Sequence, residues 1–416
     1  MSRYTLICHG CGATADASAA VICAACGEPM SLRANTRPPD DAFRGRPDSM
    51  WTYADALPIA RPDCIVSLGE GATPLVDAPR LAARAGAAQI LFKNEMANPT
   101  GSFKDRQISV GISHARELGM DTVAVVSSGN VACATAAYAA RAGMRAILFA
   151  HGHAAAGKLA QAAACGGMVV RVDTPSAQAV FDLCIGACRA FGWYHLSTAG
   201  MYEPFNVEGA KTIAYELYRQ TGGELPEWIV APVGGGGLLG GVWRGFLDLK
   251  RWGFIGRIPR LAGVQASGCA PLKKAVDNGT PFLETLRDPW PNPKTVAGGI
   301  ADDILFDGHT VLPAIRTTDG MAIAVDDNAI LAGQRELAET EGLLCEPTSA
   351  VVVAALRPLL ANHPGARIAC ILTGSGMKDL VALAAHIPIF PAIPPNLDAL
   401  KNIISIDGRD GQNGCP

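Results

Sequence analysis

From about residue 88 onward, short apolar runs rich in β-branched residues alternate with stretches of helical character. The clearest units are a strand at 122–127 followed by a helix at 130–142, which Gly143 would end. Further expected elements are strands at 145–150, 168–172, 228–233, 260–264 and 367–373, and helices at 154–165, 175–191, after Gly237, at 326–341 and at 347–362. Strands that alternate with helices predict an α/β fold with parallel sheets covered on both faces. Ligands bind such sheets beyond the carboxyl ends of the strands, where Ser127, Gly234 and Thr373 would lie.

The composition is that of a globular protein and gives no reason to expect a nucleic-acid or membrane partner. Of 416 residues, 49% are hydrophobic and 18% are charged, and this length allows two or three domains. The formal net charge is -3, and no apolar run reaches the ~18 residues that a membrane-spanning helix needs. The first residues lead into a cysteine pair without the apolar core of a signal peptide, so we expect a cytoplasmic protein.

Four of the 13 cysteines have the spacing of metal ligands. They form two Cys-x-x-Cys knuckles, each with a glycine nearby that permits a tight turn: Cys8, Cys11, Cys23 and Cys26. Four thiolates at this spacing suit tetrahedral Zn²⁺, so residues 1–33 are predicted to form a zinc-ribbon-like segment, with a metal-free, degenerate ribbon as the alternative. Nucleic-acid binding by this segment is disfavoured, because Arg3 and Arg33 are its only cations.

The segment around Lys104 combines a structured turn with a lysine at the start of a helix. Residues 98–102 read Asn-Pro-Thr-Gly-Ser, in which proline fixes one dihedral angle, glycine frees the next, and Ser102 could cap the helix. Two further segments end strand-like runs: Thr373 in Leu-Thr-Gly-Ser-Gly, and the four glycines Gly234, Gly235, Gly236 and Gly237. A partly desolvated lysine, a glycine cradle for phosphate and a strand-end hydroxyl together indicate a site for pyridoxal 5'-phosphate (PLP).

These segments resemble the fold-type II PLP enzymes of the tryptophan synthase beta superfamily, and threonine synthases in particular. Six motifs occur in the family's order and spacing: residues 67–75, the Lys104 segment, residues 127–130, the four glycines, residues 346–350 and the Thr373 segment. The resemblance implies a linker and aromatic lead-in at 34–66, a large PLP-binding domain at 67–108 and 206–390, a smaller mobile domain at 109–205, and a tail at 391–416. It also implies a small amino-acid substrate and a homodimer.

The resemblance assigns roles to individual residues as well. Lys104 would bind PLP covalently and move protons at the Cα and Cβ atoms of the substrate. The four glycines would hold the PLP phosphate through backbone N–H groups, and Thr373 would face the pyridine nitrogen. The substrate carboxylate would bind at the turn formed by Ser127, Ser128, Gly129 and Asn130, and Asn130 would also bind the phenolic oxygen of PLP.

Each of these residues has an ordinary structural alternative. An exposed helical lysine, a flexible glycine turn, a strand-end threonine and a helix N-cap are all common. Glu346, which precedes Pro347, is a further candidate, but a helix start favours a carboxylate in any case.

Three positions depart from the threonine synthase pattern. Val131 stands where a hydroxyl residue is usual, and Gln107 stands where glycine is usual. The motif Asn-Pro-x-Arg-x-Glu-Gly lacks its arginine at residues 203–209. The loop at 295–301 looks more like the corresponding loop of threonine dehydratases.

Three functions follow as hypotheses. The first is a PLP-dependent lyase that converts O-phospho-L-homoserine and water to L-threonine and phosphate. Loss of an arginine and a hydroxyl removes donors that would suit a phosphorylated substrate. This supports the second hypothesis, β-elimination or β-replacement on a serine-, threonine- or phosphoserine-like amino acid, as in a dehydratase or a cysteate synthase of a specialised pathway. The third, a catalytically weak relative that binds a ligand or partner through its ribbon, is opposed by the intact lysine, glycine and threonine set.

Overall fold

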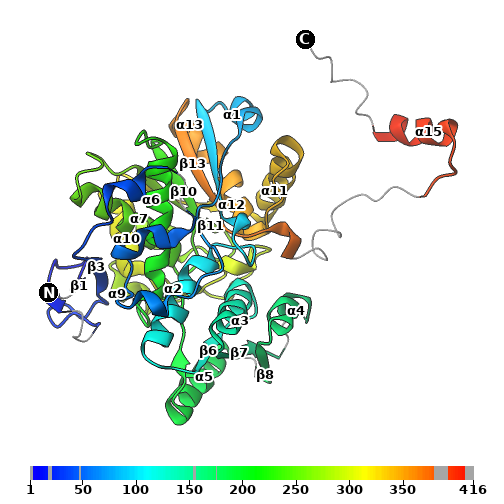
Figure 1. Cartoon of the computed structure of the whole chain (residues 1–416). Coiled ribbons are helices and arrows are strands. Elements are labelled where there is room, and N and C mark those ends of the chain that lie inside the picture. Colours follow the sequence, from blue (N-terminus) through cyan, green and yellow to red (C-terminus); the bar gives the residue numbers. More distant parts are fainter. Residues whose placement is uncertain are drawn as a thin grey trace. The chain divides into compact units, whose positions relative to one another are not determined.

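The α/β fold expected from the sequence is confirmed, and two sheets of mainly parallel strands carry it (Figure 1). The larger sheet has the strand order β12-β11-β10-β13-β5-β4, in which only β4 runs antiparallel to its neighbour. Its strands are β4 (Leu75–Asp77), β5 (Gln89–Asn94), β10 (Trp228–Pro232), β11 (Arg260–Ala266), β12 (Met321–Val325) and β13 (Arg367–Leu372). The smaller sheet is parallel, in the order β8-β7-β6-β9: β6 (Thr122–Val126), β7 (Arg145–His151), β8 (Met168–Val172) and β9 (Tyr194–His195).

This computed structural model describes residues 3–16, 21–45, 48–152, 156–174, 176–378 and 392–407. The first 378 residues form one compact unit, and residues 379–416 form a second, in which α15 (Leu397–Asp407) lies. The other α-helices are α1 (Pro79–Ala85), α2 (Lys104–Glu117), α3 (Asn130–Ala142), α4 (Ala156–Ala164), α5 (Ala177–Phe191), α6 (Lys211–Gln220), α7 (Gly237–Arg251), α8 (Pro271–Asp277), α9 (Phe282–Thr285), α10 (Gly308–Thr317), α11 (Asp327–Glu341), α12 (Pro347–Ala354) and α13 (Leu356–Asn362). Among the described residues, no helix is both long enough and apolar enough to span a bilayer.

Alternate residues of the six-stranded sheet pack on opposite faces, because successive side chains of a strand point in opposite directions. In β10, Ile229 and Ala231 join the core formed with α6, α7 and α10, whereas Trp228 and Val230 join the core formed with α1, α11 and α12. Both faces are therefore covered. This explains why the strands read as continuous apolar runs rather than as alternating ones.

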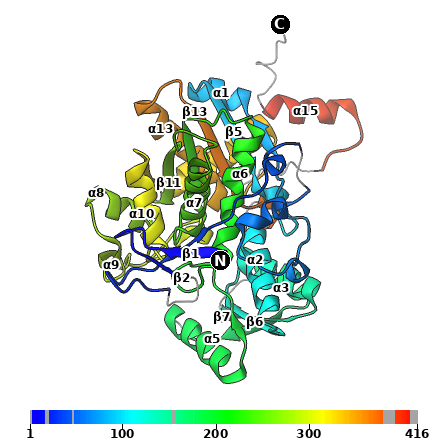
Figure 2. The same ribbon diagram turned by 60° about the vertical axis from the view of Figure 1, so that its left-hand side comes forward.

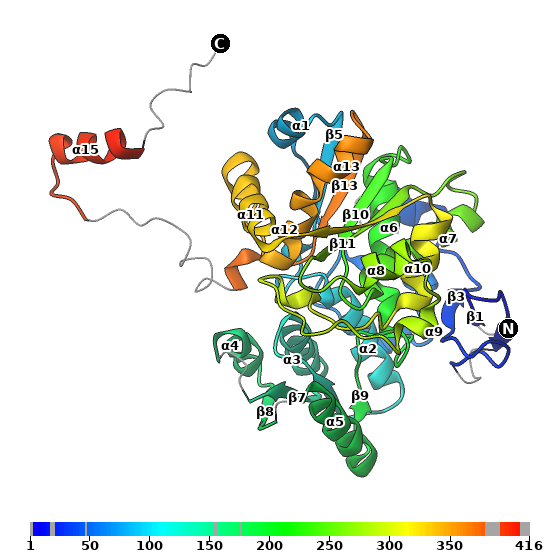
Figure 3. The ribbon, with the colours of Figure 1, turned by 180° about the vertical axis from the view of Figure 1, so that it is seen from behind.

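The four-stranded sheet and α3, α4 and α5 form a lobe of their own, seen below the larger sheet in Figures 1 and 3. All of these elements lie inside the segment 109–205 that the resemblance assigns to a smaller domain. Helix α2 connects the two regions. Its first residue, Lys104, follows a turn that is hydrogen-bonded to the residues after β13, and its later residues Ile108 and Ile112 pack in the core of the lobe together with α3.

The N-terminal segment forms a three-stranded antiparallel sheet in the order β2-β1-β3, with β1 at Tyr4–Ile7, β2 at Thr14–Asp16 and β3 at Ser31–Ala34. Figures 1 and 2 show it beside α9 and α10. Its buried side chains, among them Leu6, Met30 and Leu32, belong to the same hydrophobic core as Trp243 and Phe246 of α7. The ribbon is thus packed into the main core of the unit.

The predicted helix over 347–362 is wrong in one respect, because it is divided into α12 and α13 around Ala355. Pro358 accounts for the division. A proline inside a helix has no N–H to donate and its ring clashes with the carbonyl group four residues earlier, which here belongs to Ala354, the last residue of α12.

Candidate active site

Lys104 is the first residue of α2 and stands on a turn that is tied on both sides. After β5 the chain forms the 3-10 helix η4 (Glu95–Ala97) and turns at Gly101, whose φ of 82° lies in the left-handed region that favours glycine. The predicted cap by Ser102 is wrong, since Phe103 occupies the N-cap position and no side chain caps the helix. Instead, the carboxylate of Asp105 reaches back and accepts hydrogen bonds from the N–H and hydroxyl groups of Thr100.

The Lys104 amine lies in a desolvated position. Its Nζ donates a hydrogen bond to Gln107 Oε1 at 3.2 Å and lies 4.6 Å from the centre of the Phe103 ring. Burial lowers the pKa of Lys104 to about 8, although the carboxylates of Asp302, Asp307 and Glu346 oppose the shift. A larger share of the amine is therefore neutral at physiological pH than in an exposed lysine, as attack on an aldehyde requires.

The end of β13 holds the lysine turn against the sheet. Phe103 N donates to Thr373 O at 2.9 Å, and Ser375 N donates to Gly101 O at 3.0 Å. The Thr373 hydroxyl is buried and pairs with the hydroxyl of Ser349 at 2.9 Å, while Ser349 also accepts from Gly374 N at 2.8 Å. The structure thus brings the predicted residues Lys104 and Thr373 together.

Ser349 is a site residue that the sequence reasoning misses. It lies in the motif 346–350, which carries part of the family resemblance, but only Glu346 of that motif stands out by its charge. The sequence does not indicate that a serine at the start of an apolar helix points its side chain towards Thr373.

The four glycines join β10 to α7, and neighbouring side chains approach their backbone closely. Gly236 has a φ of 107°, and a Cβ on Gly234 would lie 2.5 Å from Asp302 Oδ2. Gly235 N donates to that same carboxylate oxygen at 2.6 Å. Burial raises the pKa of Asp302 above its usual range and raises that of Asp307, which lies beside Gly237, to about 7.

The donor set fits PLP. An N–H group of the glycine loop already donates to an anionic oxygen, and the helix N-terminus behind it favours a phosphate dianion. The amine of Lys104, the glycine loop and the Thr373 hydroxyl all stand at the carboxyl ends of β5, β10 and β13. These residues would hold the aldehyde carbon, the phosphate and the pyridine nitrogen of the cofactor.

The turn predicted to bind the substrate carboxylate follows β6 and opens α3. Gly129 N donates to Ser127 Oγ at 3.1 Å, and Ser127, Ser128 and Gly129 are all partly buried. Asn130 Nδ2 donates to both carboxylate oxygens of Glu346, at 3.0 and 3.2 Å. This contact joins the lobe of the four-stranded sheet to the side of the site that carries Thr373.

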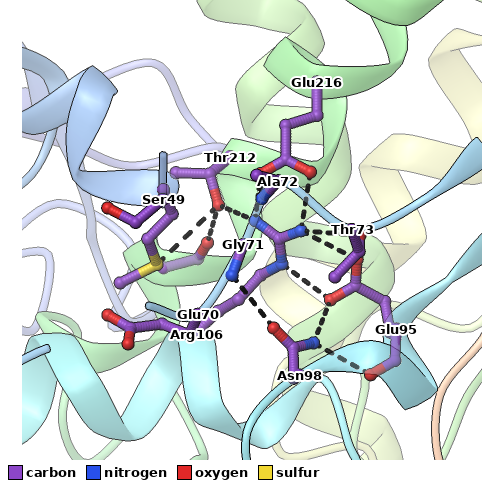
Figure 4. Close-up of polar contacts among 12 residues, drawn as sticks. Ser49, Glu70, Gly71, Ala72, Thr73, Glu95, Asn98, Arg106, Thr212 and Glu216 are labelled. Carbon is purple, nitrogen blue, oxygen red and sulfur yellow. Dashed lines mark hydrogen bonds and ion pairs between the residues drawn. The ribbon is translucent and has the colours of Figure 1, made fainter. Parts of the chain in front are cut away.

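A buried ionic network includes Arg106 of α2, two residues after Lys104, and sequence reasoning does not single it out. Figure 4 shows the Arg106 guanidinium between the carboxylates of Glu95 and Glu216, to which it donates at 2.6 Å on each side. Lys93 of β5 also donates to Glu216, at 2.5 Å. All four side chains are fully buried. A signal was present, because Lys93 interrupts the apolar run of β5 and a buried lysine needs a partner.

The predicted cysteine knuckles do meet. The sulfur atoms of Cys8, Cys11, Cys23 and Cys26 all lie within 4.8 Å of one another, with 3.4 Å between Cys8 and Cys26 and 3.6 Å between Cys11 and Cys23. Tetrahedral zinc with Zn–S bonds of about 2.3 Å would require sulfur separations of about 3.8 Å. The Cys8–Cys26 and Cys11–Cys23 separations lie just below this value and every pair lies within 4.8 Å, so the cluster fits such an ion after small shifts of the sulfur atoms.

Comparisons with known proteins agree with this geometry. A model of the family described as "Pyridoxal-phosphate dependent enzyme" matches residues 66–374. The chain is 35% identical over 410 residues to the threonine synthase of Methanocaldococcus jannaschii, covering 95% of this chain and 98% of the relative. It is 37% identical over 361 residues to the threonine synthase of Methanosarcina acetivorans, covering 86% of each.

Among solved structures, the serine racemase of maize shares the fold, with a TM-score of 0.64 at 24% identity, covering 76% of this chain and 92% of that one. The family model spans most of the catalytic unit, including the lysine turn, the glycine loop and the end of β13. The chain therefore belongs to the fold-type II family of PLP-dependent enzymes and is a lyase similar to threonine synthases.

Proposed function

We propose that this enzyme converts O-phospho-L-homoserine and water to L-threonine and phosphate. The observation that carries the proposal is the similarity to a relative named threonine synthase over 95% of this chain and 98% of that relative. The site supports it with a lysine of lowered pKa, a phosphate cradle and a turn suited to a carboxylate.

Lys104 would act as the base and acid of the reaction. Bound PLP supplies an electron sink for the electron pair that remains when a substrate proton is removed. The neutral Lys104 amine would take the proton from Cα and, once it has released that proton, a proton from Cβ, since one amine holds only one such proton at a time. The C–O bond at Cγ breaks with release of phosphate, and water adds its hydroxyl at Cβ while its other proton leaves with the phosphate. One proton goes to Cγ, which becomes the methyl group, and one returns to Cα.

The other predicted residues would orient the reactants. The N–H groups at the start of α3, with Ser127, Ser128, Gly129 and Asn130, would hold the substrate carboxylate. The Thr373 hydroxyl, paired with Ser349, would face the pyridine nitrogen. A neutral hydroxyl does not hold a proton on that nitrogen as a carboxylate would, and this favours loss of a leaving group over protonation of the cofactor.

We further propose that the cysteine cluster binds a structural Zn²⁺ and that the active protein is a homodimer. The metal proposal is supported by the four converging sulfur atoms. The dimer rests on the family resemblance.

One observation favours the second candidate, β-elimination or β-replacement on a serine-, threonine- or phosphoserine-like amino acid. Asn206 stands at the position of the arginine in the family motif, and it is fully buried with its amide donating to Ser197 O. Such an amide supplies no positive charge for the phosphate of a substrate, which would bind in addition to the phosphate of PLP. Val131, at the start of α3, likewise has no hydroxyl to offer the substrate.

Incubation of the PLP-loaded enzyme with O-phosphohomoserine decides between the two candidates. Equal amounts of phosphate and threonine are expected, and the Lys104→Ala variant should form neither. Absence of phosphate, together with a 2-oxoacid or a replacement product from serine-like amino acids, would assign the second function instead.

A further inference from the structure

Gln107 lies between the reactive lysine and the phosphate cradle. It is fully buried on α2, one helical turn after Lys104, and its Oε1 accepts the hydrogen bond from Lys104 Nζ at 3.2 Å. The other end of the same amide faces away from this contact. Its Nε2 is buried and has no acceptor within the part of the chain that the structure describes.

The unpaired Nε2 lies beside the first residue of α7. It is 3.5 Å from the point where a Cβ on Gly237 would stand, and Asp307 Oδ2 and Thr198 O are each 3.0 Å from the same point. Gly237 is the last of the four glycines, so this donor stands at the edge of the loop whose N–H groups form the cradle. A buried donor without an acceptor is costly unless a ligand or a water completes it.

We propose that Gln107 is a positioning residue that links Lys104 to the phosphate of the cofactor. Its carbonyl oxygen holds the lysine amine, and its Nε2 donates to a phosphate oxygen in the glycine cradle. The inference rests on the proposed cofactor site and not on the identity of the amino-acid substrate.

The chemistry of the side chain suits this double task. An amide offers one acceptor and two donors on a planar group, so it can hold an amine on one side and an anion on the other. Because the amide is neutral, it adds a phosphate donor without placing a second cation beside Lys104, whose neutral form must react. The nearby acids Asp302, Asp307 and Glu346 already act on the charge of that lysine.

The test compares two aldehydes that differ only in the phosphate. Apo-protein is titrated with PLP and with pyridoxal, and binding is followed by the visible absorbance of the covalent adduct. In Gln107→Met, which keeps the volume and removes the polar atoms, PLP affinity should fall about tenfold more than pyridoxal affinity, as expected for loss of one hydrogen bond to a charged group. Gln107→Glu, which keeps an acceptor for Lys104 but loses the donor, should show the same selective loss.

Gln265 provides a matched control. It is equally buried, and its Nε2 likewise has no acceptor among the described residues, but its Oε1 accepts from Leu272 N and Lys273 N at the start of α8 and not from Lys104. Gln265→Met should therefore change both affinities alike. Thermal unfolding of each apo-variant separates loss of fold from loss of binding. Equal weakening of PLP and pyridoxal in both Gln107 variants, or no weakening, would overturn the proposal. A wild-type enzyme that binds PLP but does not act on O-phosphohomoserine would contradict only the proposed function.

Discussion

At the scale of single residues, the site depends on two opposing effects on the pKa of Lys104: burial of the amine and the negative charges of the acids around it. Lys104 loses solvation, which disfavours its ammonium form, while Asp302, Asp307 and Glu346 favour that form. Burial has the larger effect, so the pKa falls to about 8 rather than rising.

This shift predicts the pH dependence of cofactor attachment. The reactive form of Lys104 is the deprotonated one, so the rate at which apo-protein forms the adduct with PLP should rise with pH and level off above a midpoint near 8. An ordinary lysine would show its midpoint near the usual pKa of about 10.4. Stopped-flow absorbance across a range of about 5 pH units, from pH 6 to 11, measures the midpoint of this rate. A midpoint near 10.4 would contradict the desolvated position of the amine.

A second prediction concerns Asp302 and the affinity for PLP. Its carboxylate accepts the hydrogen bond of Gly235 N, which the phosphate would otherwise accept. Asp302→Asn keeps the size of the side chain and removes a negative charge beside the cradle, so PLP should bind about tenfold more tightly. Removal of the same charge should also move the midpoint of Lys104 further down, since Asp302 favours the ammonium form. Fluorescence titration of the apo-variant tests the first effect, and weaker binding would show that the carboxylate assists the phosphate.

At the scale of elements, α2 depends on the buried ions beneath it. Arg106 holds the pKa of Glu95 and Glu216 below the usual range of a glutamate, because its guanidinium pairs with both carboxylates. The helix that presents Lys104 is therefore anchored two residues after the lysine.

Arg106→Met should destabilise the protein by about 3–5 kcal/mol, since it leaves the buried carboxylate of Glu95 without its cationic partner and that of Glu216 with Lys93 alone. Arg106→Lys should cost less, because it keeps the charge but loses the paired contacts of the guanidinium. Urea denaturation of both variants measures the difference. Similar stabilities for Arg106→Met and wild type would mean that the network does not anchor α2.

The sequence predicts the elements of the site better than the contacts between them. Lys104, the four glycines and Thr373 each follow a strand of parallel sheet, so their meeting at one edge could be expected from the order of elements alone. The contacts of Asp302 and Ser349 with the site could not be predicted, because Asp302 lies in a loop without periodicity and Ser349 lies at the start of an apolar helix. Strands β4 and β9 have three and two residues, too few for a recognisable period of two.

At the scale of the whole molecule, the ribbon belongs to the core of the catalytic unit. A separate ribbon at residues 1–33 would unfold alone on loss of its metal. The shared packing of Leu6, Leu32, Trp243 and Phe246 changes that expectation, since α7 begins at the phosphate cradle.

Chelation should therefore lower the unfolding temperature of the catalytic unit as well as disorder the ribbon. Metal sites of this kind contribute directly to folding energy, and here the ribbon transmits that contribution to α7. Calorimetry with and without chelator measures the shift, and elemental analysis should find about one zinc per chain. An unchanged unfolding temperature of the catalytic unit would show that the two parts are independent.

We also predict that the lobe of the four-stranded sheet moves when substrate binds. Polar contacts between this lobe and the Thr373 side include Asn130–Glu346 and Gln161–Lys378. A carboxylate at residues 127–130 would pull the lobe towards the cofactor and exclude water. Crystal structures with and without a substrate analogue should show a rigid-body displacement of residues 109–205. Superposition of the two forms without any such displacement would contradict closure.

The pairing of β5 with β13 determines when, during synthesis, an active centre comes into being. Lys378 donates to the carbonyl oxygen of Thr100 across 278 residues of chain, and β13 must be made before the lysine turn has its neighbour. Contacts so distant in sequence form late, whereas β6 to β9 follow one another and pair among themselves. A nascent chain on the ribosome thus carries its lysine without the strand that completes its surroundings until the residues of β13 have been added. The reactive amine gains its chemistry only after that point.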